Sequence, residues 1–317
     1  MNRKLKVALL SGGKSGEREV SLNSGRQVAE ALNMEKYDVR HYDPAVDLNR
    51  LIADAPDLDV ALIILHGKYG EDGTIQGLLE LIDLPYIGSG VLSSSLCMDK
   101  RASKDIYRYH GLLVPEDLIL DGHKKVDIDG IIHKLGLPVV VKPTCEGSSL
   151  GMSIPGTREE LEVGLREALA CGRYVIVEEY IKGRELTSSI IGNDNPEALP
   201  LIEIMPGDKF TFFNYEAKYV PGASREICPA PVDEETTRRA QEISLAAHKA
   251  LFCRGLSRTD MILRDDNLYV LETNTIPGMT ATSLFPQAAK AAGYTFGQTL
   301  DRLIELALED AERGQGK

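Results

Sequence analysis

The stretch from Leu256 to Asn274 is the most informative part of the sequence and reads LSRTDMILRDDNLYVLETN. Two runs with the alternation of β-strands flank a polar turn at residues 265–267, which predicts a β-hairpin. If those three residues form the loop, each residue of one strand has a defined partner on the other. The predicted pairs are Arg264 with Leu268, Ile262 with Val270, Asp260 with Glu272, and Arg258 with Asn274. Because side chains alternate between the two faces of a strand, the last two pairs share one face.

Two carboxylates oppose each other on this face of the predicted hairpin. Like charges directly opposite each other destabilise a sheet, so a cation is expected between Asp260 and Glu272. The oxygen-bearing side chains of Asp260, Glu272 and Asn274, with no His or Cys nearby in the sequence, suit Mg²⁺ rather than Zn²⁺. The alternative is a solvated polar face on which Arg258 neutralises the acids, and spacing alone leaves both interpretations open.

The N-terminal part of the chain alternates predicted strands with predicted helices. Apolar runs predict buried strands at residues 5–10, 38–42 and 60–65, and helical spacing predicts helices at 19–32 and 74–82. This alternation is typical of a parallel α/β unit with helices on both faces of its sheet. The pattern ends near Gly88-Ser89-Gly90.

The rest of the chain is less regular, so the predicted fold class is α/β with α+β character in part. Helices are expected at 99–110, 126–135, 158–170 and 234–251, and strands at 137–142, 151–154, 174–178, 185–191 and 199–204. Two further helices follow the hairpin. Residues 205–228 are rich in Gly, Pro, Phe and Tyr and have no clear period, and a loop that long inside a compact domain is usually functional.

The composition excludes several classes of partner. The 317 residues carry 36 Lys+Arg against 48 Asp+Glu, a net charge of −12, which argues against broad contact with nucleic acid or an anionic membrane. The longest apolar runs are too short to span a bilayer, and the N-terminus lacks the apolar core of a signal peptide. Five scattered cysteines without a C-x-x-C spacing indicate neither a disulfide framework nor a zinc site, so we expect a cytoplasmic protein.

Five motifs, in the same order along the chain, resemble those of the D-alanine–D-alanine ligases. They are Gly12-Gly13-x-Ser15-x-Glu17-x-Glu19-Val20-Ser21; His66-Gly67-x-x-Gly70-Glu71-Asp72-Gly73; Val141-Lys142-Pro143-x-x-Glu146-Gly147-Ser148-Ser149-x-Gly151; Tyr215-Glu216-Ala217-Lys218-Tyr219; and Glu272-Thr273-Asn274 with Pro277-Gly278-Met279-Thr280 and Ser283-Leu284. The match runs from about residue 7 to about residue 306, nearly the whole chain.

The resemblance implies an N-terminal parallel α/β domain followed by a two-domain ATP-grasp fold. The implied domains are an N-terminal substrate domain (1–90), a central ATP-grasp lid domain (91–180) and a C-terminal catalytic domain (181–317). It also implies a homodimer that joins two D-alanines at the expense of ATP, through a D-alanyl phosphate, for peptidoglycan synthesis. A sibling ligase with D-serine or D-lactate as second substrate is the alternative.

The resemblance implies a nucleotide site between the central and C-terminal domains. Lys100 and Lys142 would bind the α- and β-phosphates and Lys218 the γ-phosphate, as point charges on flexible stems suit a polyphosphate. Two Mg²⁺ ions, for which Mn²⁺ can substitute, would lie on the hairpin acids. Glu178, Glu179 and Ile181 would read adenine, largely through the backbone, and Glu185 would bind the ribose hydroxyls. Most relatives carry Lys where Glu179 stands, which is a departure from the family pattern.

The resemblance also implies roles in substrate binding and catalysis. Arg258 and the backbone N–H of Gly278 would stabilise the tetrahedral oxyanion. Glu17 would bind the first substrate's ammonium, with His66 close by, although a lone histidine can equally be a structural hydrogen-bonder. Ser283 and Leu284 would hold the second substrate's carboxylate.

A relay of Glu17, Ser148 and Tyr219 would link the three domains. The segments that carry Ser148 and Tyr219 are candidate lids that exclude water from the acyl phosphate. Tyr219 favours an amine nucleophile over a hydroxy acid. Every matched catalytic position is filled, which argues against an inactive nucleotide-binding relative.

Overall fold

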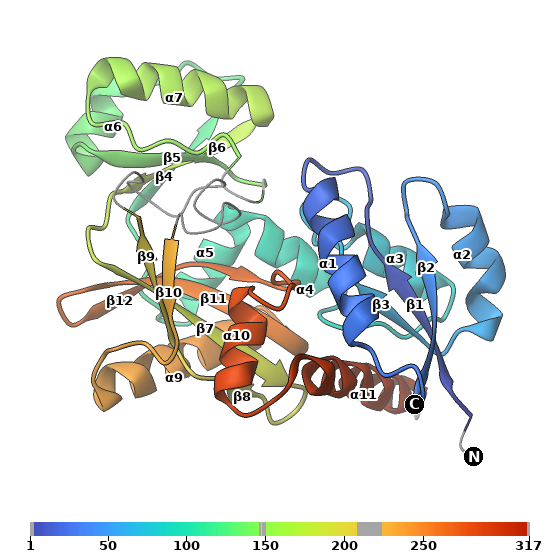
Figure 1. Cartoon of the computed structure of the whole chain (residues 1–317). Helices are drawn as coiled ribbons and strands as arrows, with labels where there is room; N and C mark the ends of the chain where they lie inside the picture. Colours follow the sequence, from blue (N-terminus) through green and yellow to red (C-terminus); the bar gives the residue numbers. More distant parts are fainter. Residues whose placement is uncertain (1–2, 146, 148–149, 208–223, 316–317) are drawn as a thin grey trace.

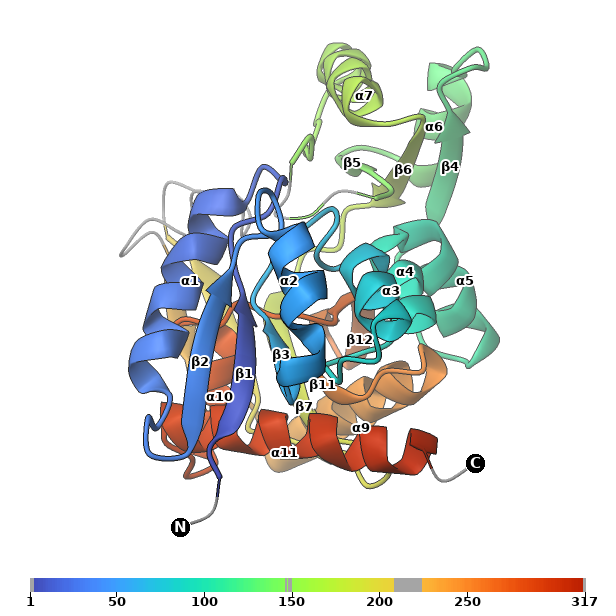
Figure 2. The same cartoon turned by 90° about the vertical axis from the view of Figure 1, so that its right-hand side faces the viewer.

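The computed structural model of the chain describes residues 3–145, 147, 150–207 and 224–315 (Figure 1). The described strands form three sheets, of three, three and six strands. Figures 1 and 2 both show the central three-stranded sheet, with its two helices, standing apart from the rest of the molecule. No helix in this described part is both long and apolar enough to cross a bilayer.

The N-terminal sheet is parallel, as predicted, with β1 in the middle. Both faces of β1 are buried, because Val7 and Leu9 enter one apolar core while Ala8 and Leu10 enter another. A strand buried on both faces has a continuous apolar run rather than an alternating one. The strands are β1 (Leu5–Leu10), β2 (Tyr37–Tyr42) and β3 (Val60–Ile63).

Helices cover both faces of this sheet, and one of them comes from the far end of the chain. Helices α2 and α3 pack on one face, while α1 and the C-terminal α11 pack on the other. Figure 2 shows α11 running across the base of the three strands. The sequence did not predict this placement of α11, nor α2. The bounds are α1 (Arg18–Ala31), α2 (Leu48–Asp54, then a 3₁₀ turn at Ala55–Asp57), α3 (Thr74–Leu81) and α11 (Phe296–Gln315).

The central sheet is antiparallel, has the strand order β4-β6-β5, and carries its own core under α6 and α7. The sequence missed β4 because its residues are all partly or fully exposed and show no alternation. The predicted extended segment 151–154 contributes a single bridge, between Val141 and Ser153. The bounds are β4 (Asp117–Asp121), α6 (Ile128–Leu135), β5 (Val139–Pro143), α7 (Arg158–Cys171) and β6 (Tyr174–Glu179).

The C-terminal sheet has the order β10-β9-β7-β11-β12, with β8 added to β7. Helices α5 and α9 pack with one apolar core of this sheet and α10 and α11 with another. The sequence missed α4, the two-residue β8, and β10, which lies inside the predicted loop 205–228. The bounds are α4 (Val91–Met98), α5 (Lys100–Tyr109), β7 (Arg184–Gly192), β8 (Glu197–Ala198), β9 (Ile202–Pro206), β10 (Ser224–Ile227), α9 (Glu234–Ala250), β11 (Gly255–Arg264), β12 (Asn267–Asn274) and α10 (Leu284–Ala291).

The β11–β12 hairpin corrects part of the predicted register. Its loop holds two residues, because Asp265 has a φ of +53° and so tightens the turn. The predicted pairs of Arg264 with Leu268 and of Ile262 with Val270 are therefore wrong, since Arg264 pairs with Asn267 and Ile262 with Tyr269.

A β-bulge then restores the predicted register. Leu271 is the extra residue of the bulge, between the pairs Met261–Val270 and Asp260–Glu272. As predicted, Asp260 pairs with Glu272 and Arg258 pairs with Asn274. Without the bulge, a two-residue loop would place Glu272 on the opposite face of the hairpin from Asp260.

Candidate functional site

A cavity of about 440 Å³ lies where the N-terminal unit, α4–α5 and the C-terminal sheet meet. Nine residues of the predicted site line it, although they come from both ends of the chain. They are Glu17, His66, Lys100, Arg258, Glu272, Asn274, Gly278, Ser283 and Leu284. Ser148, Lys218 and Tyr219 lie outside the described residues, so their predicted roles stay predictions.

The hairpin face carries a buried polar cluster around Asp260. Arg258 donates from Nε and Nη2 to the two carboxylate oxygens of Asp260, at 2.8 and 2.7 Å. Thr187 of β7 donates to Asp260 Oδ1 at 2.6 Å, and Asn274 Nδ2 lies 3.3 Å from Oδ2. Arg258 therefore neutralises Asp260 within a buried cluster, not on the solvated face that was the alternative interpretation.

Lys100 pairs with the second carboxylate of the hairpin. Its Nζ lies 3.2 Å from Glu272 Oε2, and its backbone N–H donates to the Thr144 carbonyl at the end of β5. Burial acts to lower the pKa of Lys100, but the Glu272 carboxylate outweighs burial and the net pKa is raised. Lys100 therefore carries its charge at the wall of the cavity.

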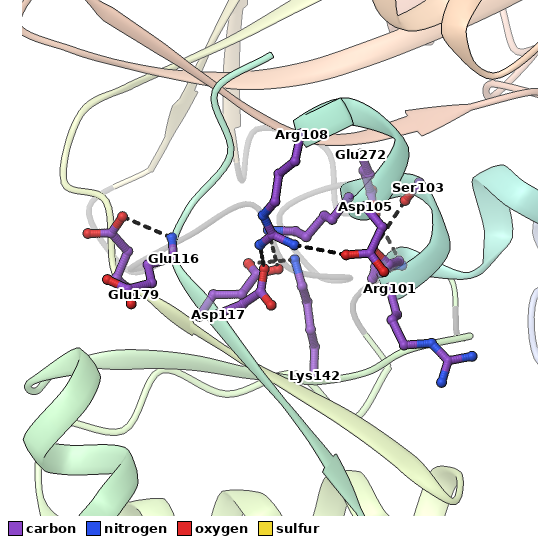
Figure 3. A network of polar contacts seen from close by, with 12 residues as sticks. Arg101, Ser103, Asp105, Arg108, Glu116, Asp117, Lys142, Glu179 and Glu272 are labelled. Atoms are coloured by element: carbon purple, nitrogen blue, oxygen red, sulfur yellow. Dashed lines mark hydrogen bonds and ion pairs between the residues drawn. The ribbon is translucent and has the colours of Figure 1, made fainter. Parts of the chain in front are cut away.

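Lys142 belongs to a buried ion triad under the central sheet. Glu178 of β6 lies 2.9 Å from Lys142 Nζ and 2.6 Å from Lys104 Nζ on α5. Burial acts to raise the pKa of Glu178, yet the two lysines lower it to about 2. The carboxylate is thus ionised and holds Lys142 toward α5, the orientation visible in Figure 3.

Sequence reasoning missed Lys104, whose side chain is fully buried. Lys104 follows Lys100 by four residues on α5, so the two share a helix face, and this spacing could have indicated it. Burial lowers the pKa of Lys104, and Glu178 opposes that shift.

The predicted adenine segment begins at the end of β6. Glu179 accepts the Glu116 N–H at 3.0 Å (Figure 3). Its carboxylate also lies 3.9 Å from Arg264 Nη1. The side chain that departs from the family pattern is therefore held locally by two partners. Ile181 is buried, and Glu185 lies in β7 opposite Ile262.

The start of α10 forms another wall of the cavity. Ser283 stands at the N-cap position of α10, but its Oγ makes no capping hydrogen bond to the helix and instead accepts the Thr280 N–H at 3.1 Å. A Cβ on Gly278 would lie 2.9 Å from this hydroxyl, so glycine permits the close approach. Leu284 is the first residue of α10, where helix N–H groups have no partner within the helix and favour an anion.

Glu17 lies before α1 and reaches into the cavity between two glycines. A Cβ on Gly67 would lie 2.5 Å from Glu17 Oε2, and one on Gly147 would lie 2.8 Å from the same atom. Gly67 also has a φ of +67°, which L side chains adopt rarely. The carboxylate therefore rests directly on the backbone of these two positions.

His66 is buried and lines the same cavity as Glu17. Burial first, and then Arg258, lower its pKa to about 4, so the imidazole is neutral near pH 7. Ser15 Oγ donates to the His66 carbonyl at 2.7 Å, while Nε2 has no hydrogen-bond partner among the described residues. The unpartnered ring nitrogen is consistent with a group that meets a ligand.

Glu71 also lines the cavity, and sequence reasoning gave it no role. Glu71 belongs to the family motif at His66–Gly73. Membership of that motif could have indicated a functional residue, but nothing in the sequence assigned a chemical role to its carboxylate. Its Oε2 accepts the Gly67 N–H at 2.6 Å.

Most of the chain matches two family models of known proteins. Residues 44–89 match the family model described as D-ala D-ala ligase N-terminus, and residues 89–305 match the model described as D-ala D-ala ligase C-terminus. The chain belongs to the D-alanine–D-alanine ligase family. It is 57% identical to the D-alanine–D-alanine ligase of Syntrophobacter fumaroxidans, over 97% of this chain and 99% of the relative.

Solved structures of family members share its fold. A ligase of this family from Bacillus anthracis, complexed with ATP, aligns with a TM-score of 0.86 at 37% identity, covering 98% of this chain and 99% of that one. The VanG D-Ala:D-Ser ligase of Enterococcus faecalis aligns with a TM-score of 0.83 at 31% identity, covering 96% and 100%. The predicted family and ATP-grasp fold class are confirmed. The chain is an ATP-dependent ligase of this family, whose activity, the joining of two D-alanines, serves peptidoglycan synthesis.

Proposed function

We propose that this cavity joins two D-alanines through a D-alanyl phosphate, with both substrates and the γ-phosphate of ATP meeting inside it. The observation that carries the proposal is the convergence on one cavity of a carboxylate (Glu17), two cations (Lys100 and Arg258) and a helix N-terminus (Leu284). These groups match the ammonium, phosphate and carboxylate groups that the reaction must hold.

The hairpin acids are proposed as the magnesium ligands. Asp260, Glu272 and Asn274 offer hard oxygen donors on one hairpin face, which fits Mg²⁺ and tolerates Mn²⁺. Among the described residues, no three His, Cys, Asp or Glu side chains are clustered to hold a metal, so phosphate oxygens would complete the coordination. Asp260, Glu272 and Asn274 would hold two Mg²⁺ ions, whose positive charge would offset the negative charge that develops in phosphoryl transfer.

The remaining nucleotide contacts are proposed from their positions around the proposed magnesium ligands. Lys100 and Lys142 would bind the α- and β-phosphates, and Glu178 orients Lys142 for this task. The backbone from Glu178 to Ile181 would face adenine, and Glu185 would face the ribose. Lys218, outside the described residues, is proposed to reach the γ-phosphate.

Arg258 is proposed to stabilise the oxyanion formed when the second amine attacks, together with the Gly278 N–H. Its pairing with Asp260 fixes the guanidinium at the cavity wall, and fixed donors stabilise developing charge without reorganisation. Glu17 and His66 would bind the first substrate. Ser283 and the N–H of Leu284 would bind the second carboxylate, while Ser148 and Tyr219 would extend the relay from Glu17.

Replacing Arg258 tests this assignment. Arg258→Ala should lower turnover by about 10²–10³-fold while ATP binding changes little, because loss of one oxyanion donor has that effect. Phosphate release measures the first quantity and equilibrium binding of a fluorescent ATP analogue the second. The control is Arg238→Ala, an exposed arginine on α9, which should retain full activity. Undiminished turnover in Arg258→Ala would contradict the role.

Substrate choice separates the proposed reaction from its alternative. D-Alanine as second substrate is favoured because the relative with 57% identity is a D-alanine–D-alanine ligase, whereas the D-Ala:D-Ser ligase is 31% identical. ADP release with D-alanine alone should match or exceed release with D-alanine plus D-serine or D-lactate. Turnover only when D-serine or D-lactate is present would favour the sibling activity.

We also infer three properties of the whole protein. The domain limits are proposed at 1–90, 91–180 and 181–317. A homodimer is proposed, with the exposed Ile52 of α2 and Leu92 of α4 as candidate contacts, and light scattering of the purified protein would test it. A cytoplasmic location is proposed because the reaction consumes ATP.

A further inference from the structure

Two cysteines that are far apart in the sequence meet beside the substrate cavity. Cys97 stands near the end of α4 and Cys253 stands in the turn between α9 and β11, and their sulfurs are 3.8 Å apart. Both thiols are free, and Cys97 also lines the cavity. The two residues are separated by 156 positions in the chain, so only the fold brings their sulfurs together.

The backbone holds the turn that carries Cys253 against the segment that leads into α4. The Cys253 N–H donates to the His248 carbonyl at 2.9 Å, which ties the turn to the end of α9. A Cβ on Gly255 would lie only 3.3 Å from the backbone nitrogen of Gly88, so the two segments lie in close contact. The approach of the two sulfurs therefore follows from the packing of the backbone around them.

The hydrogen bonds around the pair distinguish one sulfur from the other. Ser93 precedes Cys97 by one turn on the same face of α4, and its Oγ donates to Cys253 Sγ at 3.3 Å. Hydrogen bonding from Cys97 first, and then from Ser93, lowers the pKa of Cys253 although burial opposes the shift. The pKa of Cys97 is raised, first by its hydrogen bond to Cys253 and then by burial. Cys253 is thus the sulfur that more readily becomes a thiolate, the form that attacks an oxidant.

The pair is accessible and is better suited to a disulfide than to a metal. Cys253 is only partly buried and Cys97 lines the cavity, so a small oxidant can reach the two sulfurs. Among the described residues, no three His, Cys, Asp or Glu side chains are clustered to hold a metal ion. Two thiols side by side have a simpler chemistry available, which is oxidation to a disulfide.

A bond between the two sulfurs would act on Lys100. Only Asp99 separates the last residue of α4 from Lys100, the first residue of α5. Bond formation draws the sulfurs from 3.8 Å to about 2 Å, and so pulls the end of α4 toward the turn before β11. Lys100 Nζ lies 3.2 Å from Glu272 Oε2 at the cavity wall, so a shift of the α4 end moves this charge relative to the hairpin.

We propose that Cys97 and Cys253 form a reversible disulfide on exposure to hydrogen peroxide, and that this bond lowers turnover by displacing Lys100. The effect on turnover rests on the proposed function, in which Lys100 binds phosphate. The Cys253 sulfur attacks one peroxide oxygen as the O–O bond breaks, which gives a sulfenic acid and one water. The Cys97 sulfur then attacks that of Cys253, the S–O bond breaks, and a second water leaves. Two thiols and one peroxide thus give one disulfide and two waters, and a dithiol reduces the bond again by exchange.

Peptide mapping of the whole protein tests the disulfide. The reduced protein is treated with hydrogen peroxide, the remaining thiols are alkylated, and the peptides are identified by mass spectrometry. The wild type should give a pair of peptides linked through Cys97 and Cys253, which dithiothreitol separates. Cys253→Ser should not give this pair. The matched control Cys171→Ser, at an exposed cysteine on α7, should give the pair as the wild type does.

Phosphate release with ATP and D-alanine tests the effect on turnover. Peroxide should lower wild-type turnover by about tenfold or more, because a displacement of about 1 Å in a site has an effect of that order, and dithiothreitol should restore it. Cys253→Ser should keep its turnover after the same treatment. Cys145→Ser controls for direct oxidation near Lys100, since Cys145 is exposed and close to that charge, and it should respond to peroxide as the wild type does.

The two measurements keep the disulfide distinct from the proposed function. If the oxidised wild type contains no linked peptide, the proposal is overturned, and this result does not depend on how any variant folds. Unchanged turnover after the link has formed would overturn the displacement of Lys100. If the reduced protein shows no turnover with D-alanine, the proposed function fails, while the peptide map still decides whether the disulfide forms.

Discussion

Gly67 has two separate reasons to be glycine, and they can be tested apart. Its φ of +67° strains any L side chain, and a Cβ would collide with the Glu17 carboxylate. Gly111 has a similar φ of +73° with open space around it. The two positions therefore share the strain but not the collision.

Alanine substitutions at these two glycines should differ in activity but not in stability. Gly67→Ala and Gly111→Ala should each lower the free energy of unfolding by about 1–2 kcal/mol, the cost of a left-handed L residue. Only Gly67→Ala should raise the KM for the first D-alanine, by about tenfold or more, because the new methyl group displaces Glu17. Urea unfolding and steady-state kinetics measure the two effects. Equal kinetics in both variants would mean that the position of Glu17 does not depend on its close approach to Gly67.

At the scale of elements, the Lys104–Glu178–Lys142 triad joins α5 to the central sheet. Each residue comes from a different element, and Lys104 and Glu178 are almost completely inaccessible to solvent. Removing one member of such a cluster leaves a buried charge uncompensated. The triad therefore links the stability of this junction to pH.

The pH dependence follows from the lowered pKa of Glu178. The folded pKa is about 2 and the ordinary value is 4.5, so the stabilisation is fully present above about pH 4.5 and is lost as the pH falls toward 2. Its size is about 3 kcal/mol. Urea unfolding should show a stability gap between wild type and Glu178→Gln that narrows from pH 6 to pH 3. The exposed Glu35→Gln should show no gap at any pH, and a constant gap for Glu178→Gln would contradict the argument.

At the scale of the whole molecule, the N-terminal sheet shares its apolar core with the last helix of the chain. Leu300, Leu303 and Ile304 of α11 pack in the same cluster as Val7 and Leu9 of β1. The last helix thus completes the domain that the first strand begins. The two ends of the chain should therefore unfold together.

Leu303→Ala tests this shared core. The fully buried side chain should cost about 2–5 kcal/mol of unfolding free energy when truncated, and amides of β1 should lose hydrogen-exchange protection together with those of α11. Leu81→Ala removes the same atoms from a side chain that is 84% exposed and should change stability by less than about 0.5 kcal/mol. Loss of protection confined to α11 would show that the core is not shared.

Local patterns determined a large part of this protein. The alternation of side chains put Arg258 and Asp260 on one face of β11, and Glu272 and Asn274 on one face of β12, because the period of a strand is a property of adjacent residues. That these two faces coincide depends also on the bulge at Leu271. The same logic predicted the parallel N-terminal sheet, and the ordered motifs indicated the family before any contact was known.

Only the tertiary structure decided which distant residues meet. The bulge at Leu271, the burial of Lys104 against Glu178, and the contact of both Glu17 and Glu71 with Gly67 have no local period. They arise because packing brings separate elements together, and electrostatic effects act through space rather than along the chain. The sequence therefore determined the parts of the site, while the fold decided which lysines are held in place by an acid.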